Sequence, residues 1–348
     1  MIARRAAPAA CVLVAAAAIT AIVVASVAAV KAWAAGPGPG GGRGEQLVDA
    51  AERAVREYAF SGVVAVEWYE SGRKKTERVP VHDDDGMLQL GTTTRVMTDG
   101  ERTLVRESDG WTVLWGGHVA TGQRPSPEAK YDLNVTGRVL VAGREATVVE
   151  AREERTGALR ERLYFDDATN LMLRREQIGS GGRVDRAVGF VTLTAPTTIA
   201  TRRAASPHPT HVAQPKPVTE VGSAYRAPRT VGRGYHLVDA YEQPGGGVQL
   251  YYSDGLFTMS VFEQRGPLDE SALPRGGRDE TIGGRRVRVY ETPGVDTIVW
   301  GANDVAYSCV TDAPRPDLVA ALDALPAARG RGALGSLAHF VLAPFSWD

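Results

Sequence analysis

The chain has 348 residues, of which 43% are hydrophobic and 23% charged, so it belongs to the globular class and is long enough for two domains. Its 40 lysine and arginine residues against 41 aspartate and glutamate residues leave a net charge of −1, which gives no sign of the basic face of a nucleic-acid-binding protein. The two cysteines, Cys11 and Cys309, exclude a disulfide framework and a zinc-type or redox spacing.

Residues 1–35 have the composition of a membrane or targeting segment. Two arginines precede Ala6–Val30, an uncharged run of 25 residues that would extend about 37 Å as a helix, enough to cross a bilayer. The arginines favour an N-terminus that stays in the cytoplasm. Ala32–Ala34 offers the alternative of a cleaved signal peptide. We favour an uncleaved transmembrane anchor, and under either alternative the chain from Glu45 onward lies outside the cytoplasm.

The next part of the chain predicts a helix followed by a long series of strands. Residues 36–44 form a Gly- and Pro-rich tether, and Glu45–Ala59 places apolar residues at helical spacing. From Gly62 onward, strand patterns alternate with turn residues, most clearly in Arg160–Thr194, which indicates three antiparallel strands joined by short turns. This order predicts an α+β domain over residues 45–195, in which a curved antiparallel sheet closes over a helix.

The remaining chain predicts a linker and a smaller domain. Residues 196–227 contain many prolines and little apolar periodicity, which indicates an interdomain linker. Residues 228–327 show further strand patterns and a helix at Pro316–Leu325, which indicates a smaller antiparallel β domain with a C-terminal helix. For the tail, residues 328–348, we expect a short helix packed on a domain, with contact to a bilayer as the alternative.

No local pattern in the sequence indicates catalysis or metal binding. Asp83–Gly86 lacks the alternating ligands of a calcium loop and fits a hairpin turn. His208 and His211 lie in the predicted linker without a third ligand nearby, so we predict no metal site and no cofactor. The nucleophile elbow, the paired zinc histidines and the phosphate- and dinucleotide-binding loops do not occur in the sequence. We therefore predict a protein that is not an enzyme, and an enzyme without local motifs is the alternative.

A sheet wrapped around one helix can leave an apolar cavity between the two. Such a cavity could take an acyl chain, since burial contributes about 0.8 kcal/mol per CH₂. Most strand aromatics of the first domain are expected to serve core packing. The candidate ligand-cavity residues are Val64, Val66, Trp68, Met97 and Trp115.

Several stretches of the chain resemble the RseB/MucB family of extracytoplasmic regulators of envelope-stress sigma factors. The stretches that carry the resemblance are FSGVVAVEWY (Phe60–Tyr69), VAGREATVVEA (Val141–Ala151), Leu163–Leu193, Gly234–Asp269 and Val299–Pro326. They cover most of residues 45–326 in the family's order, with the linker in the matching place. They are patterns of strands and turns rather than catalytic signatures. The excess of arginine over lysine is typical of a high-GC bacterium.

The resemblance implies a fold and a function. The first domain would be similar to the LolA/LolB lipoprotein carriers, a half-barrel closed by a helix. The protein would be a non-enzymatic regulator that binds the extracytoplasmic segment of a single-pass anti-sigma factor, with a lipid-like ligand displacing that partner. A lipid or lipoprotein carrier of the LolA/LolB type is the alternative. The chain departs from the family at its N-terminus, where we predict a membrane anchor instead of a cleavable signal.

Overall fold

The computed structural model describes residues 42–325 except for gaps at 71–72, 85–86, 92–93, 99–101, 108–109, 117–129, 180, 199–211, 214–215, 218–226, 244–246 and 292–294. The predicted membrane segment at residues 1–35, most of the tether and the tail at residues 328–348 lie outside the described residues. So do His208 and His211 of the predicted linker. Within the described part of the chain, none of the helices combines the length and the hydropathy that crossing a membrane requires.

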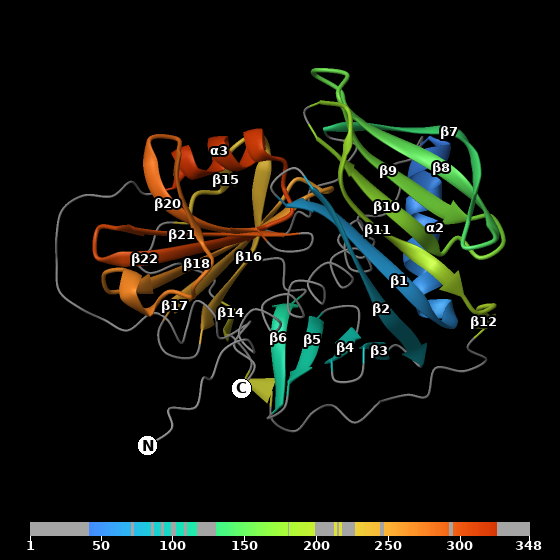
Figure 1. Ribbon diagram of the computed structural model, residues 1–348, viewed down its shortest axis with the longest axis horizontal. Coiled ribbons are helices and arrows are strands. Elements are labelled where there is room, and N and C mark those ends of the chain that lie inside the picture. The colour runs from blue at the N-terminus through green and yellow to red at the C-terminus, as the bar shows by residue number, and fades with distance from the viewer. Residues whose placement is uncertain are drawn as a thin grey trace.

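A large sheet and one helix form the first domain (Figure 1). The helix α2 spans Arg43–Glu57, so it begins two residues before the predicted Glu45, inside the predicted tether. Thirteen strands form the sheet in the order β13-β6-β5-β4-β3-β2-β1-β11-β10-β9-β8-β7, and β12 pairs with β1. The strands that lead from α2 to the linker are β1 (Tyr58–Glu70), β2 (Arg73–Asp84), β3 (Met87–Leu90), β4 (Thr94–Thr98), β5 (Arg102–Glu107), β6 (Gly110–Gly116), β7 (Tyr131–Val141), β8 (Arg144–Glu153), β9 (Leu159–Asp166), β10 (Met172–Ile178), β11 (Val184–Leu193) and β12 (Thr197–Thr198).

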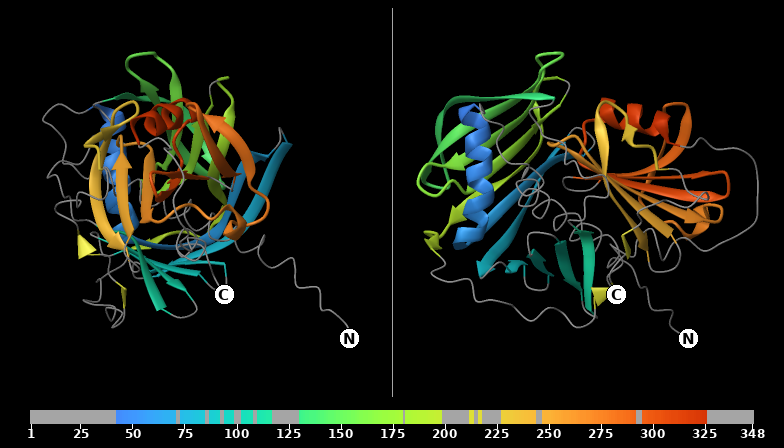
Figure 2. Two further views of the ribbon diagram at one scale, coloured as in Figure 1. Left: turned by 90° about the vertical axis from the view of Figure 1, so that its left-hand side faces the viewer. Right: turned by 180° about the vertical axis from the view of Figure 1, so that it is seen from behind.

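The apolar face of α2 packs against the concave side of this sheet. Val48, Ala51 and Ala54 on one face of the helix are at most 2% exposed, as expected for apolar residues spaced three and four apart. The helix starts so close to β7 that a Cβ atom on Gly44 would lie 2.2 Å from the carbonyl oxygen of Leu133. Figure 2 shows α2 lying across the strands of the first domain, which curve around it.

The second domain is a smaller antiparallel sheet with a helix on it. Its nine strands follow the order β14-β16-β17-β18-β22-β21-β20-β19, and β15 pairs with β16. Leu318 and Leu322 of the helix are fully buried, which fixes the helix on the sheet. The elements are β15 (Thr230–Val231), β16 (Tyr235–Gln243), β17 (Gly247–Ser253), β18 (Thr258–Arg265), β19 (Arg278–Ile282), β20 (Arg285–Glu291), β21 (Asp296–Ala302), β22 (Val305–Thr311) and α3 (Arg315–Ala324).

The segment predicted as a linker, residues 196–227, contributes short strands to both sheets, and one of them is β12 (Thr197–Thr198), which pairs with β1 of the large sheet. Strand β13 (Val212–Ala213) pairs in parallel with β6 of the large sheet. Strand β14 (Lys216–Pro217) pairs antiparallel with β16 of the small sheet. Strands of two residues leave no periodicity in the sequence, so the prolines and the low apolar content were the only signals at this place.

The predicted α+β architecture is confirmed. An antiparallel sheet wraps around one helix, and a smaller antiparallel domain ends in a helix close to the predicted Pro316–Leu325. The main apolar core is continuous across the two domains, because Tyr131 and Leu133 of β7 belong to the same cluster as Leu256 and Phe257 of the second domain. The two sheets therefore meet through a shared apolar core.

Candidate functional site

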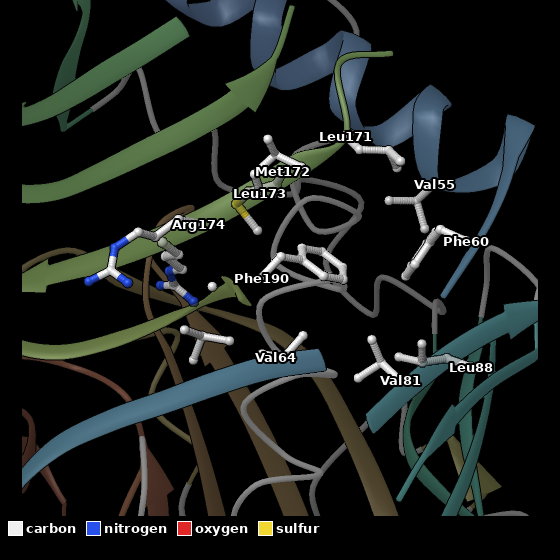
Figure 3. Close-up of a pocket in the computed structure, with 13 residues that line it drawn as sticks. Val55, Phe60, Val64, Val81, Leu88, Leu171, Met172, Leu173, Arg174 and Phe190 are labelled. Atoms are coloured by element: carbon white, nitrogen blue, oxygen red, sulfur yellow. The ribbon is translucent and has the colours of Figure 1, made fainter. Parts of the chain in front are cut away.

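An apolar pocket lies inside the first domain, between α2 and the sheet. It holds about 590 Å³ of space between atoms, part of it open to solvent, and its cavity volume is about 50 Å³. Figure 3 shows Phe190 near its centre, with α2 above it and β1 below it. Arg174 and Arg175 of β10 are its charged lining residues. The apolar lining consists of Val55, Phe60, Val64, Val81, Leu88, Leu171, Met172, Leu173, Val188 and Phe190, and Gly189 completes the wall.

A β-bulge shapes one side of this pocket. The pairing of β1 with β11 shifts register between Val63 and Val64, so that Val64 faces Phe190 across the strands. A bulge of this kind bends a strand and redirects its side chains. Nearby, Gly62 approaches β11 so closely that a Cβ atom on it would lie 2.1 Å from the carbonyl oxygen of Thr192. The pocket therefore lies beside a bulge in the sheet and a close approach of β1 to β11.

The five predicted cavity residues have separate places in the structure. Val64 lines the apolar pocket. Val66 is fully buried in the cluster of apolar side chains beside it. Trp68 lines a different cavity, the cleft between the domains described below. Met97 and Trp115 lie on β4 and β6, and their side chains are outside the described part of the structure. Sequence reasoning missed the pocket residues on β10 and β11. These strands lie far from α2 in the sequence, and only the folded sheet brings them close to the helix.

The junction between the domains holds a buried ion-pair network around Arg175. Its guanidinium donates to the buried carboxylate of Glu161 (Nε to Oε1, 2.8 Å), which belongs to the same domain. Across the junction, its Nη2 donates to the carbonyl oxygen of Leu256 (3.0 Å) and to Oδ2 of Asp312 (3.2 Å). The Arg175 side chain is 5% exposed and those of Glu161 and Asp312 are 0% and 4% exposed. One arginine therefore joins the wall of the pocket to the second domain.

A second buried group pairs Lys130 of the first domain with two carboxylates of the second. Its Nζ lies 2.5 Å from Oδ2 of Asp254 and 3.1 Å from Oδ2 of Asp317. The hydroxyl of Tyr131 donates to the same Asp254 oxygen at 2.7 Å. The ring of Tyr131 meets that of Phe257 edge to face, with the centroids 6.4 Å apart. Apolar contact and charge pairing thus coincide at this junction.

The acidic residues at the junction are held in place by their own domain. Asp254 uses Oδ1 to accept from the backbone N–H groups of Leu256 and Phe257 at 3.0 and 2.8 Å. Asp312 uses Oδ1 to accept from the N–H of Thr258 at 2.7 Å. Each carboxylate then presents Oδ2 to a cation of the first domain. The second domain therefore offers preoriented anions, and the first domain offers the cations that meet them.

Burial at the junction shifts several pKa values. Desolvation raises the pKa of Glu161 to about 7; Arg175 opposes this shift, whereas Asp312 and Asp254 add to it. Desolvation, together with the charge of Asp254, also raises the pKa of Tyr131 well above its ordinary value of 10. These two groups lie beneath the contact between the domains and line neither cavity.

A cleft of about 900 Å³, part of it open to solvent, runs along the outer side of this junction. The first domain contributes the aromatic side chains of Trp68 and Tyr69, and Tyr69 is 50% exposed. Arg186 of the first domain and Asp296 of the second close one part of the cleft with a 2.6 Å contact between Nη2 and Oδ1. Further lining residues are Arg160, Gln177, Ile178, Gly179, Asp185, Phe257, Glu291, Asp312, Ala313, Pro314, Arg315 and Pro316. The cleft thus offers aromatic and charged groups of both signs.

Comparison with known proteins gives matches among solved structures. No family model matches the chain, and no curated protein matches it. The crystal structure of MucB in complex with MucA(peri) is 19% identical, with 80% of this chain and 97% of that chain covered, at a TM-score of 0.45. The chain is similar to MucB. The Pseudomonas aeruginosa MucA/MucB complex matches at 18% identity, 83% and 100% coverage and a TM-score of 0.43.

A more distant match is a LolA superfamily protein from Nitrosomonas europaea, at 7% identity and a TM-score of 0.20, with 78% of this chain and 91% of that chain covered. Among the described residues, no group of three or more histidine, cysteine, aspartate or glutamate side chains is placed to hold a metal ion.

Proposed function

We propose that the chain is a non-enzymatic regulator that binds the extracytoplasmic segment of a single-pass anti-sigma factor in the cleft between its domains. The observation that carries the proposal is the composition of that cleft, whose walls come from both domains and combine the exposed Tyr69 and the half-buried Trp68 with charges of both signs. The sequence resemblance to the RseB/MucB family supports the same function.

An extended polypeptide fits these walls better than a small metabolite does. Trp68 and Tyr69 offer flat apolar surface of the kind that anchors protein contacts. Arg160 and Arg315 come from opposite domains and line the cleft together with acidic residues, so a segment with mixed charges would find a partner for each sign.

We also propose that the two domains lie outside the cytoplasm and that residues 1–35 hold the protein at the membrane. A tether of a few residues would keep both domains close to a partner in the same membrane and raise the effective concentration of the two. We propose residues 45–195 and 228–327 as the two domains and 196–227 as the connection, with residues 328–348 as a tail.

We propose a lipid-like ligand for the apolar pocket. Its lining is apolar apart from Arg174 and Arg175, which are both paired with carboxylates, and this lining suits the acyl chain of such a ligand. Arg174 is paired with Glu176 and Glu67 at 2.8 and 3.1 Å. The same pocket favours a second candidate function, a lipid or lipoprotein carrier of the LolA/LolB type.

The partner is tested with the full chain in mild detergent as bait for solubilised membranes of the source organism. Wild type is expected to retain a single-pass protein with a small cytoplasmic sigma-binding domain. Tyr69→Ala should weaken this binding about tenfold, which corresponds to 1.4 kcal/mol. Leu140→Ala is the matched control, because Leu140 is 72% exposed and lies outside the cleft lining. Equal retention by both variants would contradict the cleft as the binding site.

The ligand is tested separately with a fluorescent fatty acid. Wild type should bind the probe, and Val64→Phe, which fills the pocket with a larger side chain, should reduce that binding at least tenfold while leaving partner retention measurable. Recovery of lipid or lipoproteins alone from the membrane extract would favour the carrier instead.

A further inference from the structure

Glu161 lies at the centre of the domain junction, among more acids than bases. It is fully buried on β9. Of the charged groups that act most strongly on it, Arg175 of β10 is the cation, and Asp254 and Asp312 of the second domain are anions. Tyr131 of β7, itself hydrogen-bonded to Asp254, is close enough to interact with its charge. Both acids that oppose its ionisation thus come from the second domain.

The hydrogen bonds of Glu161 leave one of its oxygens unsatisfied. Oε1 accepts from Arg175, whereas Oε2 is buried without a hydrogen-bond partner among the described residues. A buried carboxylate oxygen without a partner costs free energy, and the cost is larger for the charged form. The protonated carboxyl avoids most of this cost, so the packing of the junction favours a neutral Glu161.

We propose that Glu161 is a pH-sensitive latch between the domains: docking of the second domain holds a proton on Glu161, and loss of that proton as the pH rises loosens the junction. The ionised group would compete with Asp312 for Arg175 and would repel Asp254. This inference does not depend on the proposed partner.

The direction of the effect follows from proton linkage. In the docked form, burial raises the pKa of Glu161 to about 7 from an ordinary value of 4.5, and Asp312 and Asp254 of the second domain add to this shift. The pKa would fall toward its ordinary value when the second domain leaves and water enters. Because the docked form binds the proton more tightly, docking is strongest at the acidic end of this window. As the pH rises from 4.5 to 7, the ratio of open to docked molecules should increase by up to about tenfold per pH unit, and above 7 it should become constant.

The test measures the distance between the domains in the full chain by electron paramagnetic resonance. Spin labels are attached at Glu154→Cys and Arg286→Cys, two exposed positions on different domains. Cys11 is replaced by serine, and Cys309 is too deeply buried to react. Between pH 5 and 7 the wild type should gain a population with longer distances, and Glu161→Gln should show one distribution at every pH.

Glu150→Gln is the matched control. Glu150 is paired with Arg152 and Arg162, and these pairs lower its pKa, so it does not titrate in this window. This variant should keep the pH dependence of the wild type. A pH-independent distance in the wild type, or a pH dependence retained by Glu161→Gln, would overturn the latch. If Glu161→Gln fails to fold, a carbon-13 titration of the wild-type side chain decides, and a midpoint below pH 5 would refute the proposal.

Discussion

The apolar pocket and the domain junction share Arg175 but are held together by different forces. Around the pocket, aliphatic and aromatic side chains meet at a bend in the sheet, and space is left between them. At the junction, cations of the first domain meet preoriented carboxylates of the second, and little of either is exposed. We therefore expect side-chain changes around the pocket to cost less folding free energy than the loss of a charged group at the junction, where each buried charge needs its partner.

The largest effect should come from removing the arginine common to both regions. Arg175→Ala leaves Glu161 and Asp312 buried without their cation. Removing one partner of a buried ion pair costs about 3–5 kcal/mol of folding free energy, measured by urea unfolding of the full chain. Arg162→Ala is the control, since Arg162 is 33% exposed and pairs with Glu150 near the surface, so it should cost at most about 1 kcal/mol. A loss for Arg175→Ala as small as this would mean that the junction charges contribute little.

The next prediction compares two valines on the same strand. Val66 is fully buried outside the pocket lining, whereas Val64 borders the pocket and has empty space on one side. Val66→Ala removes close contacts and creates a new void, so it should cost about 2–3 kcal/mol, whereas Val64→Ala should cost about 1–2 kcal/mol because fewer contacts are lost. Both values follow from urea unfolding. A higher cost at Val64 than at Val66 would mean that the pocket is filled in solution.

The two regions also differ in how far the sequence predicted them. The helix and the strands of residues 159–193 follow from local spacing and turn residues, and the structure contains them with small shifts at their ends. Val64 was predicted to line a cavity because it lies on a strand of a sheet that wraps around one helix, and the same reason applies to Val66. Which of these valines meets empty space depends on a bulge and on strands far along the chain, and local periodicity carries no information on either.

The buried charges of the junction escaped sequence analysis for a different reason. Alternating strands with charged residues suggest one face exposed to solvent, and no feature of the sequence marked Glu161 and Arg175 as buried. A signal was nevertheless present, because Arg160, Glu161 and Arg162 are consecutive in a strand, and successive side chains point to opposite faces. At least one of them had to face inward. The second-domain acids that act on Glu161, Asp254 and Asp312, lie more than ninety residues away and could not be placed beside it from the sequence.

The smallest predicted effect concerns the ion pair between Arg186 and Asp296, which lies at the rim of the junction rather than at its centre. The side chains of Arg186 and Asp296 are 19% and 16% exposed, so water and salt reach this pair more easily than they reach Arg175. Arg186→Ala should therefore cost about 1 kcal/mol or less at physiological ionic strength. At 1 M salt the screening length falls to about 3 Å, and the difference from wild type in urea unfolding should shrink further. The cost of Arg175→Ala should persist at the same salt concentration, because it arises from buried groups left unpaired. If salt reduced both costs equally, solvent would reach the centre of the junction as readily as its rim, and the division between the two would fail.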